Sequence, residues 1–192
     1  MQIYLIGPSG SGKDTQAKIL AGKYHLTWIS GGDLLRARAK IDDEEGRYIK
    51  MHIDNGDLVD WSHLMPIMKD RLTKVPKDYI WTGFPRLYEQ TFELDELLKD
   101  NFPSLDLVIN LSLSDEHSRK RIEYRRSTDE KIREDDTKDE LIQKRIDWYK
   151  NSIDRIKEYY LKTNRFVEID AQHDIPTIAK NISEIIDAHF GL

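Results

Sequence analysis

The residues best suited to chemistry lie near the start of the chain, in the sequence G-P-S-G-S-G-K at residues 7–13. An apolar run at residues 3–6 precedes this glycine-rich segment, and a helix-like sequence follows it at residues 15–20. Glycines lack a Cβ, so consecutive backbone N–H groups can face inward, while the start of a helix adds the positive end of its dipole. Lys13 adds a full positive charge. The segment therefore predicts a loop that binds a polyphosphate.

The usual form of this motif places a serine or threonine directly after the lysine, where its hydroxyl can bind magnesium. In this chain Asp14 follows Lys13, and the hydroxyl belongs to Thr15. This departure leaves open a simpler interpretation, a flexible glycine turn beside a solvated lysine. The strand before the loop and the helix after it favour phosphate binding.

Arginines further along the chain are placed where they could hold phosphate groups. Arg36 lies in the first turns of a helix, and a guanidinium can bind a phosphate through two N–H groups. Arg86 ends the sequence G-F-P-R, which follows a strand-like run. Parallel sheets bind ligands at the carboxyl ends of their strands, where Arg86 would lie. Arg121 and Arg125 share a helix face because they are four residues apart. Each of these patterns also fits an ordinary exposed arginine or a solvated charged helix.

The composition limits the classes of protein and ligand. A chain of 192 residues with 39% hydrophobic and 34% charged residues is typical of one globular domain with a highly charged surface. The net charge of -5 argues against a nucleic-acid partner, so an anionic ligand would need a local basic pocket. The absence of cysteine excludes disulfides and cysteine-ligated zinc. No apolar run approaches the ~20 residues of a membrane span, and we expect a cytoplasmic protein with no membrane partner.

The arrangement of the elements predicts an α/β fold. Strand-like runs occur at residues 3–6, 27–29, 79–81, 107–111 and 166–169, each separated by helical pattern. Strands that alternate with helices imply a parallel sheet. The final helix, from Pro176 through Ile186, has apolar residues spaced three and four apart and should pack one face on that sheet. Asp60 is expected to cap a helix that begins near Trp61.

Taken together, these motifs resemble the adenylate kinase family of nucleoside monophosphate kinases, and the resemblance covers nearly the whole chain. It is carried by G-P-S-G-S-G-K-D-T-Q, S-G-G-D-L-L-R, G-D-L-V, G-F-P-R with Gln90, the R-x-x-x-R-R helix, R-E-D-D and Arg145. It implies a single P-loop kinase domain over residues 1–192, with a five-stranded parallel sheet flanked by helices. It also implies an inserted lobe at residues 30–59 that binds the monophosphate and a short lid at residues 125–136 without a zinc-holding ribbon.

The activity that the resemblance implies is reversible phosphoryl transfer from ATP to AMP, giving two ADP, with Mg²⁺ as the cofactor and no zinc. A monomer is expected. The catalytic residues would be Lys13, Arg86, Arg125, Arg133 and Arg145. ATP would be bound by Gly10, Ser11, Gly12, Lys13, Asp14, Thr15, Arg121, Arg125 and His173. AMP would be bound by Gly31, Arg36, Asp57, Leu58, Val59, Gly83, Phe84, Pro85, Arg86, Gln90, Arg133 and Arg145, and the metal residues would be Thr15 and Asp33.

Three positions depart from the adenylate kinase pattern. Gly31 stands where adenylate kinases carry threonine and pyrimidine monophosphate kinases carry alanine, whereas Gln90 points to adenine. A kinase for CMP, UMP or a deoxynucleotide therefore remains an alternative. Thr82 replaces the aspartate that usually precedes G-F-P-R and orders the water shell of magnesium, and Asp14 replaces a small residue.

The departures at positions 14 and 82 leave room for a nucleotide-binding regulator with weakened catalysis. Asp14 itself has two interpretations. In the simpler one its side chain points outward and favours the helix N-terminus. In the other it partly supplies the carboxylate that is missing at position 82.

Overall fold

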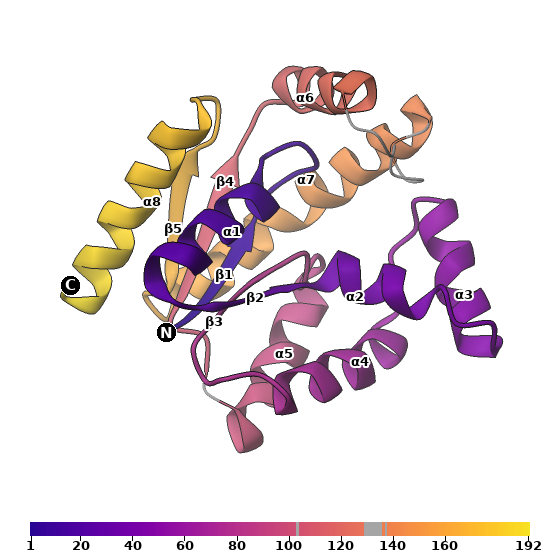
Figure 1. Ribbon diagram of the computed structural model, residues 1–192, viewed down its shortest axis with the longest axis horizontal. Coiled ribbons are helices and arrows are strands. Elements are labelled where there is room, and N and C mark those ends of the chain that lie inside the picture. Colours follow the sequence, from indigo (N-terminus) through magenta and orange to yellow (C-terminus); the bar gives the residue numbers. More distant parts are fainter. Residues whose placement is uncertain (103, 129–135, 137) are drawn as a thin grey trace.

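Five parallel strands form the sheet at the centre of the computed structural model, which describes residues 1–102, 104–128, 136 and 138–192 (Figure 1). The strand order is β2-β3-β1-β4-β5. The strands are β1 (Gln2–Ile6), β2 (Thr27–Ser30), β3 (Tyr79–Thr82), β4 (Leu107–Ser112) and β5 (Phe166–Asp170). Each predicted strand is confirmed and is one residue longer than expected. Leu5 of β1 lies opposite Thr82 of β3 and Ile109 of β4.

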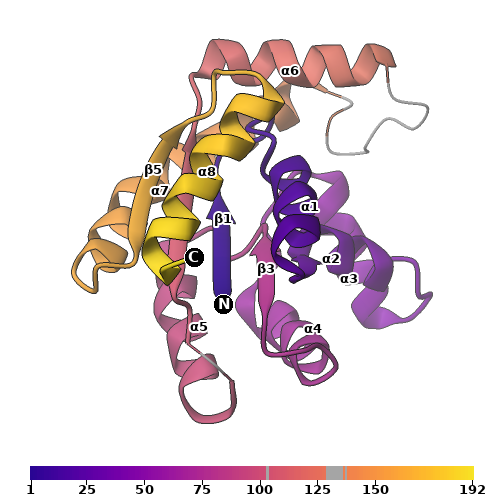
Figure 2. The same ribbon diagram turned by 60° about the vertical axis from the view of Figure 1, so that its left-hand side comes forward.

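Helices connect the strands and cover both faces of the sheet, as predicted for an α/β P-loop fold (Figures 1 and 2). Those that the structure describes are α1 (Lys13–Tyr24), α2 (Gly31–Arg38), α3 (Glu44–Asp54), α4 (Trp61–Thr73), α5 (Tyr88–Asn101), α6 (Asp115–Thr128), α7 (Asp139–Leu161) and α8 (Ile175–Phe190). Within the described ranges, none of these helices has the length and apolar character needed to cross a membrane.

The two faces of the sheet have separate hydrophobic cores, because successive side chains of a strand point to opposite faces. Ile3 and Leu5 of β1 pack with the apolar side of α1 and α8, including Ile182. Tyr4 of β1 packs on the other face with residues of α4, α5 and α7, including Ile156. Burial on both faces explains the almost uninterrupted apolar sequence of β1 and β4.

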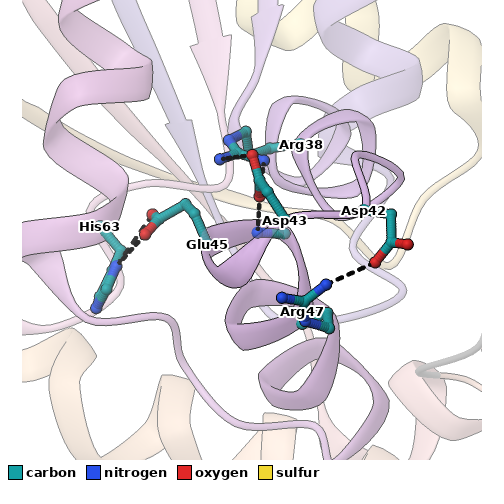
Figure 3. A network of polar contacts seen from close by, with 7 residues as sticks. Arg38, Asp42, Asp43, Glu45, Arg47 and His63 are labelled. Carbon is teal, nitrogen blue, oxygen red and sulfur yellow. Dashed lines mark hydrogen bonds and ion pairs between the residues drawn. The ribbon is translucent and has the colours of Figure 1, made fainter.

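Polar contacts join α2, α3 and α4 into one unit (Figure 3). Asp43 accepts a hydrogen bond from the backbone N–H of Gly46 at 2.7 Å and is held by Arg38 through both carboxylate oxygens at 2.9 Å. His63 of α4 lies 2.8 Å from Glu45 of α3. These contacts tie the three helices together beside the sheet edge that carries β2 and β3.

The helix expected near Trp61 does begin there, as α4. Asp60 is the N-cap residue of this helix, as predicted, although its side chain makes no capping hydrogen bond. Its carboxylate instead accepts a hydrogen bond from the hydroxyl of Tyr48 at 2.8 Å, which joins α3 to the start of α4. The tertiary contact thus replaces the local one.

Candidate active site

The glycine-rich loop lies between β1 and α1, as the sequence predicts. Gly10 and Gly12 have φ of 82° and 83°, a left-handed conformation that side chains other than glycine rarely adopt. Gly10 also lies against α6, since a Cβ on it would come within 2.8 Å of the carbonyl oxygen of Ser118. Helix α1 starts at Lys13, so its first N–H groups face the loop, where they can bind an anion.

Lys13 folds back over this loop. Its Nζ donates a hydrogen bond to the carbonyl oxygen of Pro8 at 3.3 Å. The side chain also lines a pocket together with Arg86 and Arg145, which come from β3's end and from α7. Three of the five predicted catalytic cations therefore line the same pocket, although they are far apart in the sequence.

A pocket beside the loop, which we call the ATP-side pocket, contains most residues predicted to bind ATP. Those that line it are Gly10, Ser11, Gly12, Thr15, Arg121, Arg125 and His173. Arg121 joins α6 to the loop before α8, since its Nη2 donates to the carbonyl oxygen of His173 at 3.0 Å. Gln16 of α1 holds the start of α8 by donating to the carbonyl oxygen of Ile175 at 3.0 Å.

A second pocket, which we call the AMP-side pocket, contains most residues predicted to bind AMP. Those that line it are Arg36, Asp57, Leu58, Val59, Gly83, Arg86, Gln90 and Arg145. Pro85 lines the adjoining pocket that contains Lys13. Leu58, Gly83, Arg86 and Arg145 line both, so the space beside Lys13 continues into this second pocket.

The polar groups in the second pocket are held by specific contacts. Arg86 donates from Nε to the carbonyl oxygen of Gly83 at 2.9 Å. Gln90 is buried, and its Oε1 accepts hydrogen bonds from the backbone N–H groups of Arg86 at 2.8 Å and Leu87 at 3.2 Å. Arg36 lies 2.6 Å from Asp33, so the carboxylate that was predicted to serve magnesium is paired with an arginine predicted to hold the monophosphate.

Asp136 links Arg125, which lines the ATP-side pocket, to Arg145, which lines the AMP-side pocket. Its carboxylate, with the residue only 1% exposed, accepts hydrogen bonds from Arg125 and, at 2.8 Å, from Arg145. Arg126 donates to its backbone oxygen. The sequence motif R-E-D-D contains Asp136, but it was not assigned a site role. The other three residues of that motif, including Arg133, lie outside the described residues. So does most of the lid expected at residues 125–136.

Among the described residues that were predicted to bind AMP, two do not line these pockets. Phe84 is buried and stacks on Trp61, with ring centroids 4.8 Å apart, so its ring belongs to the core beneath the pocket. Gly31 lies against the end of β3, where a Cβ would come within 3.3 Å of the carbonyl oxygen of Thr82. A larger residue at position 31 would therefore press on this strand end.

Several lining residues were missed in the sequence. Tyr124, which is exposed, lines the ATP-side pocket next to Arg125, while Trp148 and Tyr149 line the pocket of Lys13. The latter two follow Arg145 by three and four residues, so a helical pattern could have placed them on its face. Burial raises the pKa of Tyr149 to about 12, and the neutral phenol donates to Asn110 at 2.9 Å.

Asp14 and Thr82 are in direct contact. The hydroxyl of Thr82 donates to Oδ1 of Asp14 at 2.6 Å. The Asp14 side chain therefore points toward the end of β3, and the interpretation in which it points outward is wrong.

The oxygen donors at the mouth of the loop fit Mg²⁺. Thr15 and Ser11, which both carry a hydroxyl, line the ATP-side pocket, and the buried hydroxyl of Ser11 finds no hydrogen-bond partner among the described residues. Across the described ranges no three His, Asp or Glu side chains converge as a metal cage. Mg²⁺ does not need one, because it usually keeps several waters and binds through one or two protein oxygens and the phosphates of its substrate.

A phosphate loop at the carboxyl edge of a parallel sheet, with arginine-lined pockets on both sides, defines a kinase of the P-loop class. A family model described as adenylate kinase matches residues 5–165. The chain belongs to the adenylate kinase family.

Curated relatives match over almost the full chain. The adenylate kinase of Methanothrix thermoacetophila is 33% identical over 211 residues, covering 97% of this chain and 98% of the relative. That of Archaeoglobus fulgidus is 32% identical over 213 residues, with the same coverage. That of Azobacteroides pseudotrichonymphae is 34% identical over 192 residues and covers 99% of both chains.

Proposed function

We propose that this chain catalyses the reversible, Mg²⁺-dependent transfer of a phosphoryl group from ATP to AMP, giving two ADP. The observation that supports this most strongly is that Lys13, Arg86 and Arg145 line one pocket, which continues into the pocket of Arg36 and Gln90. The ATP-side pocket is lined by other residues of the same loop, Gly10, Ser11 and Gly12. Family membership supports the same pair of substrates.

The chemistry explains why cations dominate this site. The attacking oxygen belongs to a phosphate that is already anionic, so no side chain needs to remove a proton. The obstacles are charge repulsion and alignment, and positive groups around the transferred phosphoryl overcome both. Exclusion of water prevents hydrolysis of ATP.

The residue roles follow from this chemistry. In this proposal the loop from Gly10 to Thr15 holds the phosphates of ATP, with Lys13 following the transferred group. Arg121 and Arg125 contact ATP from α6, with His173 beside the adenine. Mg²⁺ bound with ATP would neutralise charge on the phosphates, with the Thr15 hydroxyl serving it, while Asp33, the other predicted metal residue, is paired with Arg36 at 2.6 Å.

On the acceptor side, Arg36 and Arg86 hold the phosphate of AMP. The segments 57–59 and 83–85 line its base and sugar, and Gln90 reads the adenine. Arg133 and Arg145 act on the phosphates during transfer. Residues 30–59 would be the lobe that binds AMP. The lid expected over ATP at residues 125–136 stays a prediction, because residues 129–135 lie outside the described part of the chain. A single chain supplies the residues of both pockets, which supports a monomer, and we expect it to act in the cytoplasm, where both substrates occur.

A second acceptor class is favoured by one observation. Gly31 brings no side chain to the region between Thr82 and Phe84, whereas the resemblance to the family implies threonine or alanine at this position. CMP, UMP or a deoxynucleotide is therefore the alternative acceptor.

The test is acceptor-resolved turnover. The purified chain is given ATP with AMP, dAMP, CMP or UMP, with and without Mg²⁺, and nucleoside diphosphates are quantified. The proposal predicts the highest kcat/KM for AMP and loss of turnover in EDTA. A higher kcat/KM for a pyrimidine acceptor would support the alternative. Tight ATP binding without diphosphate formation at any Mg²⁺ concentration would instead indicate a regulator.

A further inference from the structure

We propose that Asp14, oriented by Thr82, supplies the carboxylate that positions Mg²⁺ beside the phosphate loop. This inference rests on the proposed function, because it concerns the metal that accompanies ATP. It assigns one residue of α1 to a task that a strand end usually performs.

The need for such a residue follows from the sheet. In P-loop proteins the metal is held by the hydroxyl of the loop and by an aspartate at the end of a neighbouring strand. The neighbours of β1 are β3 and β4, which end at Thr82 and Ser112. Both of these residues are neutral, so the strand ends beside the loop supply hydroxyl groups in place of a carboxylate.

Asp14 occupies the corresponding place from the opposite side. Its Oδ1 lies 2.6 Å from the hydroxyl of Thr82, so the carboxylate lies beside the end of β3. In the sequence it stands between Lys13 and Thr15, which line the pockets on the two sides of the loop. The start of α1 favours a negative charge at this position.

A further contact fixes the direction of the Thr82 hydrogen bond. Thr82 is 1% exposed, and its hydroxyl oxygen lies 3.4 Å from Nε1 of Trp28. An indole N–H can only donate, so the Thr82 oxygen accepts from Trp28 and directs its own hydrogen to Asp14. Thr82 therefore acts as a positioning residue that sets the orientation of the carboxylate.

The charge of Asp14 should affect the binding of metal-free ATP and of Mg²⁺-bound ATP differently. A carboxylate at the phosphate loop repels metal-free ATP, whereas a divalent cation between the carboxylate and the phosphates turns the repulsion into attraction. The ratio of the ATP dissociation constant in EDTA to that in MgCl₂ should therefore depend on Asp14. If Asp14 only stabilised α1 and β3, its replacement would change both dissociation constants by the same factor.

The experiment measures this ratio by isothermal titration calorimetry, without AMP. Asp14→Asn keeps an oxygen that can accept from Thr82 and removes only the charge. We expect it to lower the ratio by about tenfold or more, the size of effect known for residues that support a metal site. Thr82→Val removes the orienting hydroxyl and should lower the ratio to a smaller extent. Asp42→Asn, at an exposed carboxylate on the far end of the AMP-side lobe, serves as the matched control.

Moving the carboxylate provides the second arm. Asp14→Gly should lower the ratio, and the double variant Asp14→Gly/Thr82→Asp, which places the carboxylate at the strand end, should restore it. An unchanged ratio in Asp14→Asn, or a double variant no better than Asp14→Gly, overturns the inference. These titrations need no turnover. If the ratio of ATP dissociation constants falls in Asp14→Asn as expected but the parent forms no ADP, the proposed function is refuted and this inference stands.

Discussion

Arg125 and Arg145 donate hydrogen bonds to different oxygens of one carboxylate, that of Asp136. Arg125 lines the ATP-side pocket and Arg145 lines the AMP-side pocket. The buried carboxylate thus holds together two cations that approach the proposed transfer site from α6 and α7. Because both arginines are already held in place, they need little rearrangement when negative charge develops between the substrates.

Replacing Asp136 by asparagine should slow turnover without removing either arginine. The neutral amide holds two guanidinium groups less firmly, and a misplacement of about 1 Å at a reacting centre can cost about 10²-fold. We therefore expect kcat for ADP formation to fall by that order while the KM for each nucleotide changes less. Asp139→Asn is the control, since Asp139 pairs with Arg126 at 2.9 Å but is largely exposed. Equal kcat values for both variants would contradict the positioning role.

Arg86 and Arg125 should each contribute strongly to the transition state. Removing one preorganised donor typically costs about 2.7 to 4 kcal/mol, or about 10² to 10³ in kcat. Steady-state kinetics of Arg86→Ala and Arg125→Ala should show losses in that range. Arg155→Ala, which removes an exposed arginine paired with Glu89, should behave like the parent. A folded Arg86→Ala variant with near-parental kcat would show that the assigned role is wrong.

Gln90 should affect both stability and acceptor choice, and two variants separate these effects. Gln90→Leu leaves the N–H groups of Arg86 and Leu87 without their acceptor, at an expected cost of about 1–3 kcal/mol in the free energy of unfolding. Gln90→Glu keeps the acceptor and loses the amide N–H₂ group. We expect its thermal stability to remain near the parent while the kcat/KM for AMP relative to CMP falls. Unchanged selectivity in both variants would rule out a role in reading adenine.

The Asp43 contacts make the stability of the α2–α4 unit sensitive to acid. Hydrogen bonds from Arg38 and from the backbone of Gly46 lower the pKa of the Asp43 carboxyl (Figure 3). Since the folded pKa lies below the unfolded one, the stabilisation is complete above the ordinary carboxyl pKa and is lost as the pH falls through the lowered value. The melting temperature of Asp43→Ala should therefore lie below that of the parent at neutral pH, and the gap should narrow at acidic pH. A gap that widens at acidic pH would contradict this contact.

The fold could be predicted from the sequence because its signals are local. Each strand is a short apolar run flanked by helical pattern, and burial on both faces leaves little ambiguity about a parallel sheet. The phosphate loop could also be located, since glycines, lysine and a helix start are adjacent in the chain. Asp60 could likewise be predicted as the N-cap residue of α4, whereas the contact of its carboxylate with Tyr48 of α3 could not, because it joins two different helices.

The finer features of the site depend on contacts between distant residues, which spacing does not reveal. Asp14 and Thr82 are 68 positions apart, and Thr82 meets Asp14 only because β3 lies beside β1. Phe84 lies within a motif predicted to contact AMP, yet stacking on Trp61 places its ring in the core. The order of motifs predicted which segments meet, whereas side-chain packing determines which atoms face the pockets.

In the proposed reaction one chain holds two nucleotides end to end across the phosphate loop. The most direct measurement is calorimetric binding of a bisubstrate analogue, two adenosines joined through five phosphates. We expect one molecule per chain and an affinity about 10² to 10⁴ times that of ATP, as for two linked ligands that engage together, with weaker binding in both Arg86→Ala and Arg121→Ala. An affinity no greater than that of ATP, or one that only one of these variants weakens, would show that the two pockets do not hold one nucleotide each.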